Sequence, residues 1–207
     1  MKFLRLVLVG LIVLMNFAIA PPSWAGKDFT KGADYTEVTQ EMTQLLQAQS
    51  TPEQLGYTQE ALQQRLAALQ IQQQIIQTAS KRAQCRNATN HKLAVYANLP
   101  KKTPTSIYFL EPGKITDDDW DCDGVYLPTG TIVATNPTEP SQPLTTPIAF
   151  KIVDGTQFVT STNFQTGAIE FNVLPAKQFH AGEVAWAIPN WTQAQIDANP
   201  ASQEILD

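Results

Sequence analysis

The sequence has few of the residues on which catalysis usually depends. Only two histidines, His91 and His180, and two cysteines, Cys85 and Cys122, occur among its 207 residues. It contains no nucleophile elbow, phosphate-binding loop, zinc-ligand spacing or dinucleotide fingerprint. Glu183 follows His180 by three residues, but in a strand or loop that spacing does not place the two side chains on one face. The sequence therefore predicts no catalytic residue.

Positive charge is also scarce. The chain has 14 basic and 19 acidic residues, a net charge of −5. Without residues 1–25, which hold Lys2 and Arg5 and no acid, the net charge is −7, and residues 85–207 hold −6 of it. A nucleic acid would be repelled by such a surface, and no basic patch offsets the repulsion. We therefore expect no nucleic-acid partner.

No apolar run reaches the roughly 20 residues that a membrane-spanning helix needs. The segment Met1–Ala25 instead combines the basic Lys2 and Arg5, the apolar run Leu6–Ile19 and a small-residue end. This pattern is typical of a secretory signal peptide cleaved after Ala25; an uncleaved N-terminal anchor is the alternative. We expect an exported protein, in the periplasm, the thylakoid lumen or outside the cell, with no stable membrane insertion after cleavage.

The two cysteines predict one disulfide, Cys85–Cys122, because an exported chain meets an oxidising compartment. The bond would close a loop of 36 intervening residues, which the chain-entropy treatment equates to about 4 kcal/mol. We expect it to tie the helical part of the chain to a β domain. The alternative is two free thiols, blunted as nucleophiles by the carboxylates near Cys122.

Residues 26–84 are predicted to be helical. Apolar residues recur at helical spacing in Tyr35–Gln49. A second helix begins either at Pro52 or after Thr58, since both positions carry start signals, and runs to about Ala83. Its polar faces are rich in glutamine.

The second helix has an apolar stripe, and two arrangements fit it. In the first, the helices form a hairpin whose stripe covers the chain's own β domain. In the second, the stripe is a coiled-coil or partner-docking seam. Arg65 is the one cation before the end of this helix, so a position on lipid is not expected. The second arrangement predicts oligomerisation through Leu62, Leu66, Leu69 and Ile76.

Residues 85–190 are predicted to form a β domain, followed by a tail, 191–207, with a short helix capped by Thr192. Asp154 and Gly155 are typical of a hairpin turn. The fold class is therefore α+β: a helical hairpin or long helix, then a small antiparallel β-barrel or sandwich. The predicted strands are Leu93–Ala97, Ser106–Leu110, Val125–Leu127, Thr131–Thr135, Ile148–Val153, Gln157–Thr160, Ala168–Val173 and Glu183–Ile188.

An acidic run, Asp117–Gly124, stands at the start of the β half. Asp119, Asp121, Asp123 and the glycine occupy positions one, three, five and six of an EF-hand loop, whose alternate carboxylates converge on calcium. The twelfth position is Gly130 in place of the bidentate glutamate, which excludes a true EF-hand. A looser calcium site remains at the three aspartates, with a solvated acidic turn as the alternative.

The same run also suits a contact with a basic protein partner. Asp117 and Asp118 would supply the charge, and Trp120 would supply the aromatic anchor that interfaces favour.

Together these features predict an exported, non-catalytic protein-binding or assembly module of the bacterial envelope or thylakoid lumen. Its partner would be another envelope or lumenal protein, and no cofactor is required. The alternatives are a calcium-stabilised binding domain and a hydrolase that uses two carboxylates of the acidic run.

Overall fold

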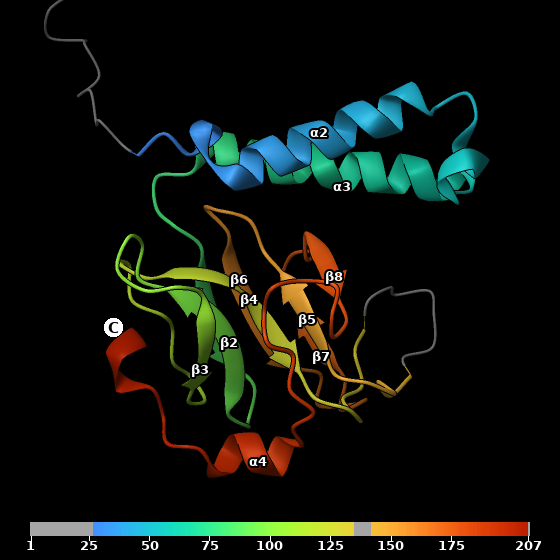
Figure 1. The fold of residues 1–207 in the computed structure, drawn as a ribbon. Coiled ribbons are helices and arrows are strands. Elements are labelled where there is room, and N and C mark those ends of the chain that lie inside the picture. The colour runs from blue at the N-terminus through green and yellow to red at the C-terminus, as the bar shows by residue number, and fades with distance from the viewer. Residues whose placement is uncertain (1–26, 135–141, 207) are drawn as a thin grey trace, which may run out of the picture.

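A computed structural model describes residues 27–134 and 142–206. The predicted signal peptide, residues 1–25, lies outside them. The described chain consists of a two-helix hairpin that lies across one end of a β domain, and of a C-terminal segment that returns along the β domain (Figure 1). This is the predicted α+β class.

The hairpin pairs α2 (Ala33–Gln47) with α3 (Gln59–Thr78), flanked by the short turns η1 (Phe29–Lys31) and η2 (Pro52–Leu55). The Thr58 hydroxyl caps α3 by accepting the Ala61 N–H at 3.1 Å, so the second of the two predicted starts is the one used. α3 ends about five residues earlier than Ala83, because Ala79 turns to extended backbone. There it packs against Gly155, where an added Cβ would lie 2.4 Å from the Ala79 Cβ.

The apolar stripe of α3 is used inside the chain. Its four predicted seam residues, Leu62, Leu66, Leu69 and Ile76, are all buried with Val38 and Leu45 of α2. This is the hairpin arrangement. Oligomerisation through these four side chains would require the hairpin to open, so the structure offers no free surface for it.

The β domain is two packed sheets and not a closed barrel. One sheet has the order β1-β6-β7 and the other β3-β2-β4-β5-β8. The strands are β1 (Gln84–Ala88), β2 (Leu93–Asn98), β3 (Ser106–Leu110), β4 (Asp121–Leu127), β5 (Ile148–Lys151), β6 (Gln157–Thr162), β7 (Ile169–Phe171) and β8 (Lys177–Phe179).

One strand pair departs from the predicted antiparallel pattern. β1 and β6 are parallel, with Cys85 opposite Phe158. The long connection between them passes through the other sheet, which gives the chain the crossover that parallel pairing needs. Neither β1 nor β8 was among the predicted strands, because Gln84–Ala88 has little β propensity and Lys177–Phe179 is very short.

Two predicted strands are wrong. Thr131–Thr135 forms only isolated bridges at Ile132 and Val133 within its described part. Glu183–Ile188 is irregular: its alternating apolar side chains pack onto the outer face of the five-stranded sheet, where Trp186 stacks on Tyr96 at 4.6 Å. An alternating apolar pattern does not show whether a segment packs on the face of a sheet or pairs with its strands.

The predicted hairpin at Asp154 and Gly155 is also wrong. The turn connects β5 to β6, which belong to different sheets. A turn is present, and Gly155 has a φ of +84°, which glycine adopts without strain, but the turn does not pair two strands of one sheet.

Candidate binding groove on the helical hairpin

The disulfide lies in the β domain. Cys85 of β1 and Cys122 of β4 are bonded, with their Cα atoms 5.8 Å apart and both residues fully buried. The predicted pairing is present, but it joins the two sheets and not the helical segment to the β domain. The prediction was wrong on this point because Cys85 belongs to strand β1, which the sequence pattern did not indicate.

The acidic run does not form one cluster. Asp121 accepts a hydrogen bond from Arg82 at 2.7 Å, and Asp123 accepts two, from Asn98 and Thr105, both at 2.8 Å. Burial raises the pKa of both carboxyl groups, while these donors act in the opposite direction. Asp119 is exposed. Each buried carboxylate therefore already has its own protein partners.

Two of the three residues predicted for a partner surface remain at the surface. Asp118 is exposed, where it pairs with Lys81 and accepts a hydrogen bond from Gln84 at 2.8 Å. Asp117 is half-buried. Trp120 is a core residue, 7% exposed, and packs edge-on against Tyr108 with ring centroids 5.0 Å apart. It offers no aromatic anchor to a partner.

In the described part of the chain, no group of three histidine, cysteine or acidic side chains is arranged to hold a metal ion. The predicted calcium site at Asp119, Asp121 and Asp123 and the hydrolase alternative stay predictions.

The helical hairpin contacts the β domain through ion pairs, a hydrogen bond and apolar packing on Val153 and Ala176. Lys151 of β5 contacts Asp34 of α2 at 2.9 Å and also pairs with Glu37. Arg65 of α3 binds Glu41 through two nitrogens, at 2.6 and 2.8 Å, and donates to the Ala176 carbonyl at 2.9 Å. These bonds hold α2 and α3 in a fixed orientation to the strands.

Gln72 of α3 is buried at 4% exposure beside the residues of these ion pairs. Its amide has no hydrogen-bond partner among the described residues. Such an unpaired buried amide costs free energy, so Gln72 does not stabilise the contact through hydrogen bonds.

A carboxyl group of the β domain, that of Asp154, also lies near the hairpin. Asp154, whose backbone N–H donates to Asp34 at 2.9 Å, is half-buried. Burial, together with the negative charges of Asp121 and Asp34, raises the pKa of its carboxyl to about 7. This carboxylate therefore titrates near neutral pH.

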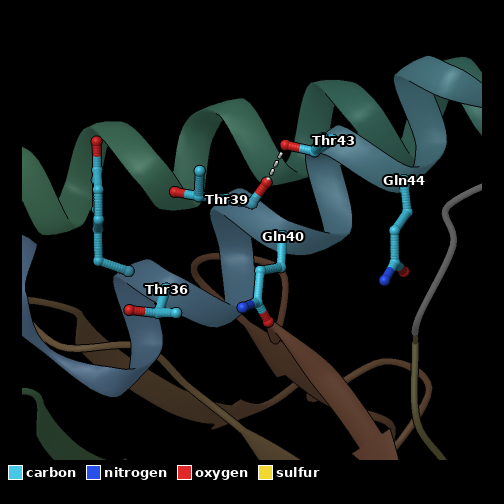
Figure 2. Close-up of a pocket in the computed structure, with 6 residues that line it drawn as sticks. Thr36, Thr39, Gln40, Thr43 and Gln44 are labelled. Atoms are coloured by element: carbon cyan, nitrogen blue, oxygen red, sulfur yellow. Dashed lines mark hydrogen bonds between the residues drawn. The ribbon is translucent and has the colours of Figure 1, made fainter.

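A broad groove runs along α2. It has a volume of about 660 Å³ and follows one helix face over more than two turns (Figure 2). It is lined by Tyr35, Thr36, Thr39, Gln40, Thr43 and Gln44, none of them charged.

The hydroxyls of the groove are mostly occupied. Thr36 donates to the Gly32 carbonyl at 3.1 Å, Thr43 donates to the Thr39 carbonyl at 2.8 Å, and the Tyr35 hydroxyl accepts from Gln77 at 3.1 Å. In contrast, the exposed amides of Gln40 and Gln44 have no partner among the described residues. Two uncharged donor–acceptor groups are therefore available to a ligand.

The sequence analysis missed this surface. The signal was a set of threonines and glutamines that recur at i, i+4 and i+8 on α2, whereas the predicted helix was defined by its apolar positions alone. A helical wheel of its polar residues would have shown the face.

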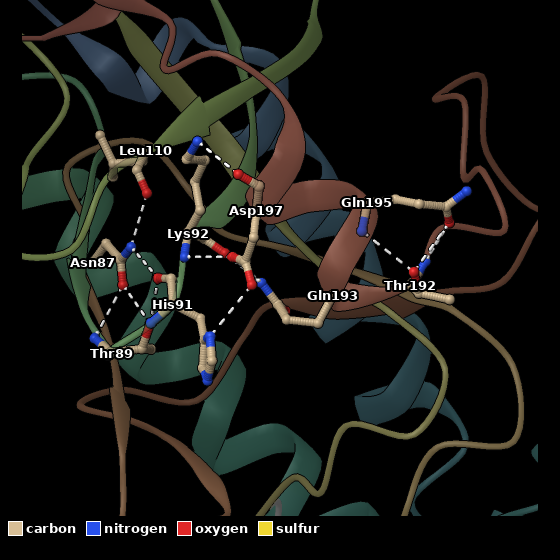
Figure 3. Close-up of polar contacts among 9 residues, drawn as sticks. All are labelled: Asn87, Thr89, His91, Lys92, Leu110, Thr192, Gln193, Gln195 and Asp197. Carbon is tan, nitrogen blue, oxygen red and sulfur yellow. Dashed lines mark hydrogen bonds and ion pairs between the residues drawn. The ribbon is translucent and has the colours of Figure 1, made fainter.

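A histidine–carboxylate pair was also missed. His91 Nδ1 lies 3.3 Å from Asp197 of α4 (Gln193–Ala198) (Figure 3). The other Asp197 oxygen accepts from the Lys92 backbone N–H and from Gln193, both at 3.0 Å. The contact anchors the C-terminal helix to the start of β2. The predicted capping box of Thr192 and Gln195 is present.

The pair of His180 and Glu183 has no catalytic geometry. Glu183 accepts the backbone N–H of His180 at 2.7 Å, and the imidazole is exposed.

Within the described residues, no helix is long and apolar enough to cross a membrane. Comparisons with protein families, with curated proteins and with solved structures found no match to this chain.

Proposed function

We propose that the mature chain is an exported, non-catalytic protein-binding or assembly module of the bacterial envelope or thylakoid lumen. Its contact surface is the groove face of α2, and its partner is another protein of that compartment. The observation that carries the proposal is the groove itself: a large, uncharged hollow with two unengaged amides on a helix fixed to its domain.

Three features support a binding role. The ion pairs of Lys151 and the Arg65 hydrogen bond to the Ala176 carbonyl hold the hairpin in one orientation, so little ordering is needed on binding. The outer surface of the hairpin is rich in amides, which pair with either donors or acceptors. The predicted signal peptide and the disulfide Cys85–Cys122 are both compatible with export.

A pull-down from the native compartment tests the proposal. The bait is the chain from residue 26 onward, as wild type and as two variants with one added charge each. Thr43→Arg places a cation in the groove, and Gln70→Arg places one on the exposed surface of α3. We expect one stoichiometric partner with wild type and Gln70→Arg, and its loss with Thr43→Arg. No partner, or equal retention by both variants, would refute the proposal.

A further inference from the structure

We infer that the groove face of α2 binds an extended polypeptide segment of its partner through the peptide backbone. The inference rests on the proposed function and specifies the chemistry of the ligand. It is carried by the spacing of Gln40 and Gln44, by the lack of partners for their amides, and by a second groove on the other side of the same two residues.

The spacing matches an extended chain. Gln40 and Gln44 lie four residues apart, which corresponds to about 6 Å along a helix axis. Two residues of an extended strand span about 6.6–6.8 Å, and alternate peptide groups on one edge point the same way. Each glutamine amide has a carbonyl oxygen and an NH₂ group, so each pairs with both the N–H and the C=O of one facing residue. Two successive facing residues would thus meet two successive glutamines.

The groove pattern matches the alternation of strand side chains. Gln40 and Gln44 line both the uncharged groove and a second groove of about 370 Å³, which also includes Glu37, Tyr57 and Lys177. A strand whose edge lies on the two glutamines directs successive side chains to opposite sides. One set would enter the uncharged groove, and the other would meet Glu37 and Lys177.

The residues that line the two grooves favour a ligand segment without charged side chains. None of the six residues that line the larger groove is charged, so a charged side chain there would lose hydration without gaining a partner. In the smaller groove Glu37 lies 3.9 Å from Lys177 and also pairs with Lys151. Glu41, which lines the same groove, pairs with Arg65, so both carboxylates already have cation partners. The expected ligand is therefore an extended segment with small, uncharged side chains at alternate positions.

A binding experiment with defined probes tests the inference. The first probe is a short fluorescein-labelled peptide of alternating threonine and alanine. The second is the matching peptoid, which has the same side chains but no backbone N–H. Binding is measured by fluorescence anisotropy with wild type, with the double variant Gln40→Met/Gln44→Met, and with the control Gln63→Met/Gln70→Met. The control residues are exposed glutamines of α3.

We expect wild type and control to bind the peptide equally, and the groove variant to bind at least about tenfold more weakly, as does wild type with the peptoid. Equal binding of peptide and peptoid, equal binding by the groove variant, or no binding of the peptide by wild type would overturn the inference. Circular dichroism melts of both variants show whether they fold. A partner lost by Thr43→Arg alongside a failed peptide test would leave the proposed function intact and remove only the extended-segment ligand.

Discussion

Cys85 is bonded to Cys122 across the two sheets of the β domain, and both residues are fully buried. The disulfide therefore fixes the packing of β1 on β4. The helical hairpin is held on the β domain by different contacts: the ion pairs of Lys151, the Arg65 hydrogen bond to the Ala176 carbonyl, and apolar packing on Val153 and Ala176. Stability of the β domain and docking of the hairpin are thus separable by mutation.

Removal of the disulfide should destabilise the β domain. For Cys85→Ala/Cys122→Ala we expect the free energy of unfolding to fall by roughly 2–5 kcal/mol, because the unfolded chain regains the entropy of the open loop. Urea unfolding followed by tryptophan fluorescence measures the change. Dithiothreitol should destabilise the wild type and leave the variant unaffected. Free thiols in the exported protein would contradict the assignment.

Asp154 should make stability depend on pH. Its pKa is raised to about 7 in the folded chain, whereas an unfolded aspartate has a pKa of about 3.9. The folded state binds more protons between these values, so the contribution of Asp154 to stability falls as pH rises through that range. Because the group is partly exposed, solvent screening reduces the effect, and we expect Asp154→Asn to gain roughly 1–2 kcal/mol at about pH 8.

The same variant should gain much less at about pH 4, where the wild-type carboxyl is protonated in the folded state. Thermal melts at both pH values measure the difference, with Asp119→Asn, an exposed aspartate, as the control. A gain for Asp154→Asn that is equal at the two pH values would argue against a raised pKa.

Lys151→Met should weaken the docking of the hairpin. The substitution removes the Lys151 cation from Asp34 and leaves Glu37 with only the longer contact to Lys177, and the Lys151 side chain is only 17% exposed. We expect a loss of about 1–3 kcal/mol in unfolding free energy and faster amide hydrogen exchange in α2. Lys31→Met, which removes a cation that is 83% exposed, is the matched control and should change little. Equal effects of the two substitutions would show that the Lys151 pairs do not hold the hairpin.

Calcium distinguishes the binding module from its calcium-stabilised alternative. Because Asp121 is held by Arg82 and Asp123 by Asn98 and Thr105, we expect millimolar calcium to leave Tm unchanged. An increase in Tm that disappears in Asp121→Asn would instead establish the alternative, since a ligand that binds only the folded state raises Tm.

The sequence predicted the features that depend on local periodicity. The stripe that includes Leu62 and Leu69 indicated the hairpin, the Thr58 cap indicated one of two helix starts, and the cysteine count indicated the disulfide. These signals lie within a few turns of one helix, or follow from the compartment that a chain enters.

Features that depend on distant contacts could not be predicted. Nothing in Gln84–Ala88 indicates that it pairs with β6. The disulfide was therefore predicted to join the helical segment to the β domain, whereas it joins the two sheets. Trp120 was expected at a partner surface because its neighbours are acidic, yet it is buried in the core against Tyr108. Burial raises the pKa of Asp154, together with the charges of Asp121 and Asp34, which are remote in sequence. Burial and pairing of this kind are set by the tertiary fold.

Photo-crosslinking in the native compartment tests the central claim, that the groove face of α2 binds another protein, most directly. A photoreactive phenylalanine analogue replaces Thr43, which lines the groove, or Lys114, an exposed residue after β3. We predict one prominent cross-linked partner from position 43 and none from position 114. Equal labelling from both positions, or no cross-link from position 43, would contradict the account.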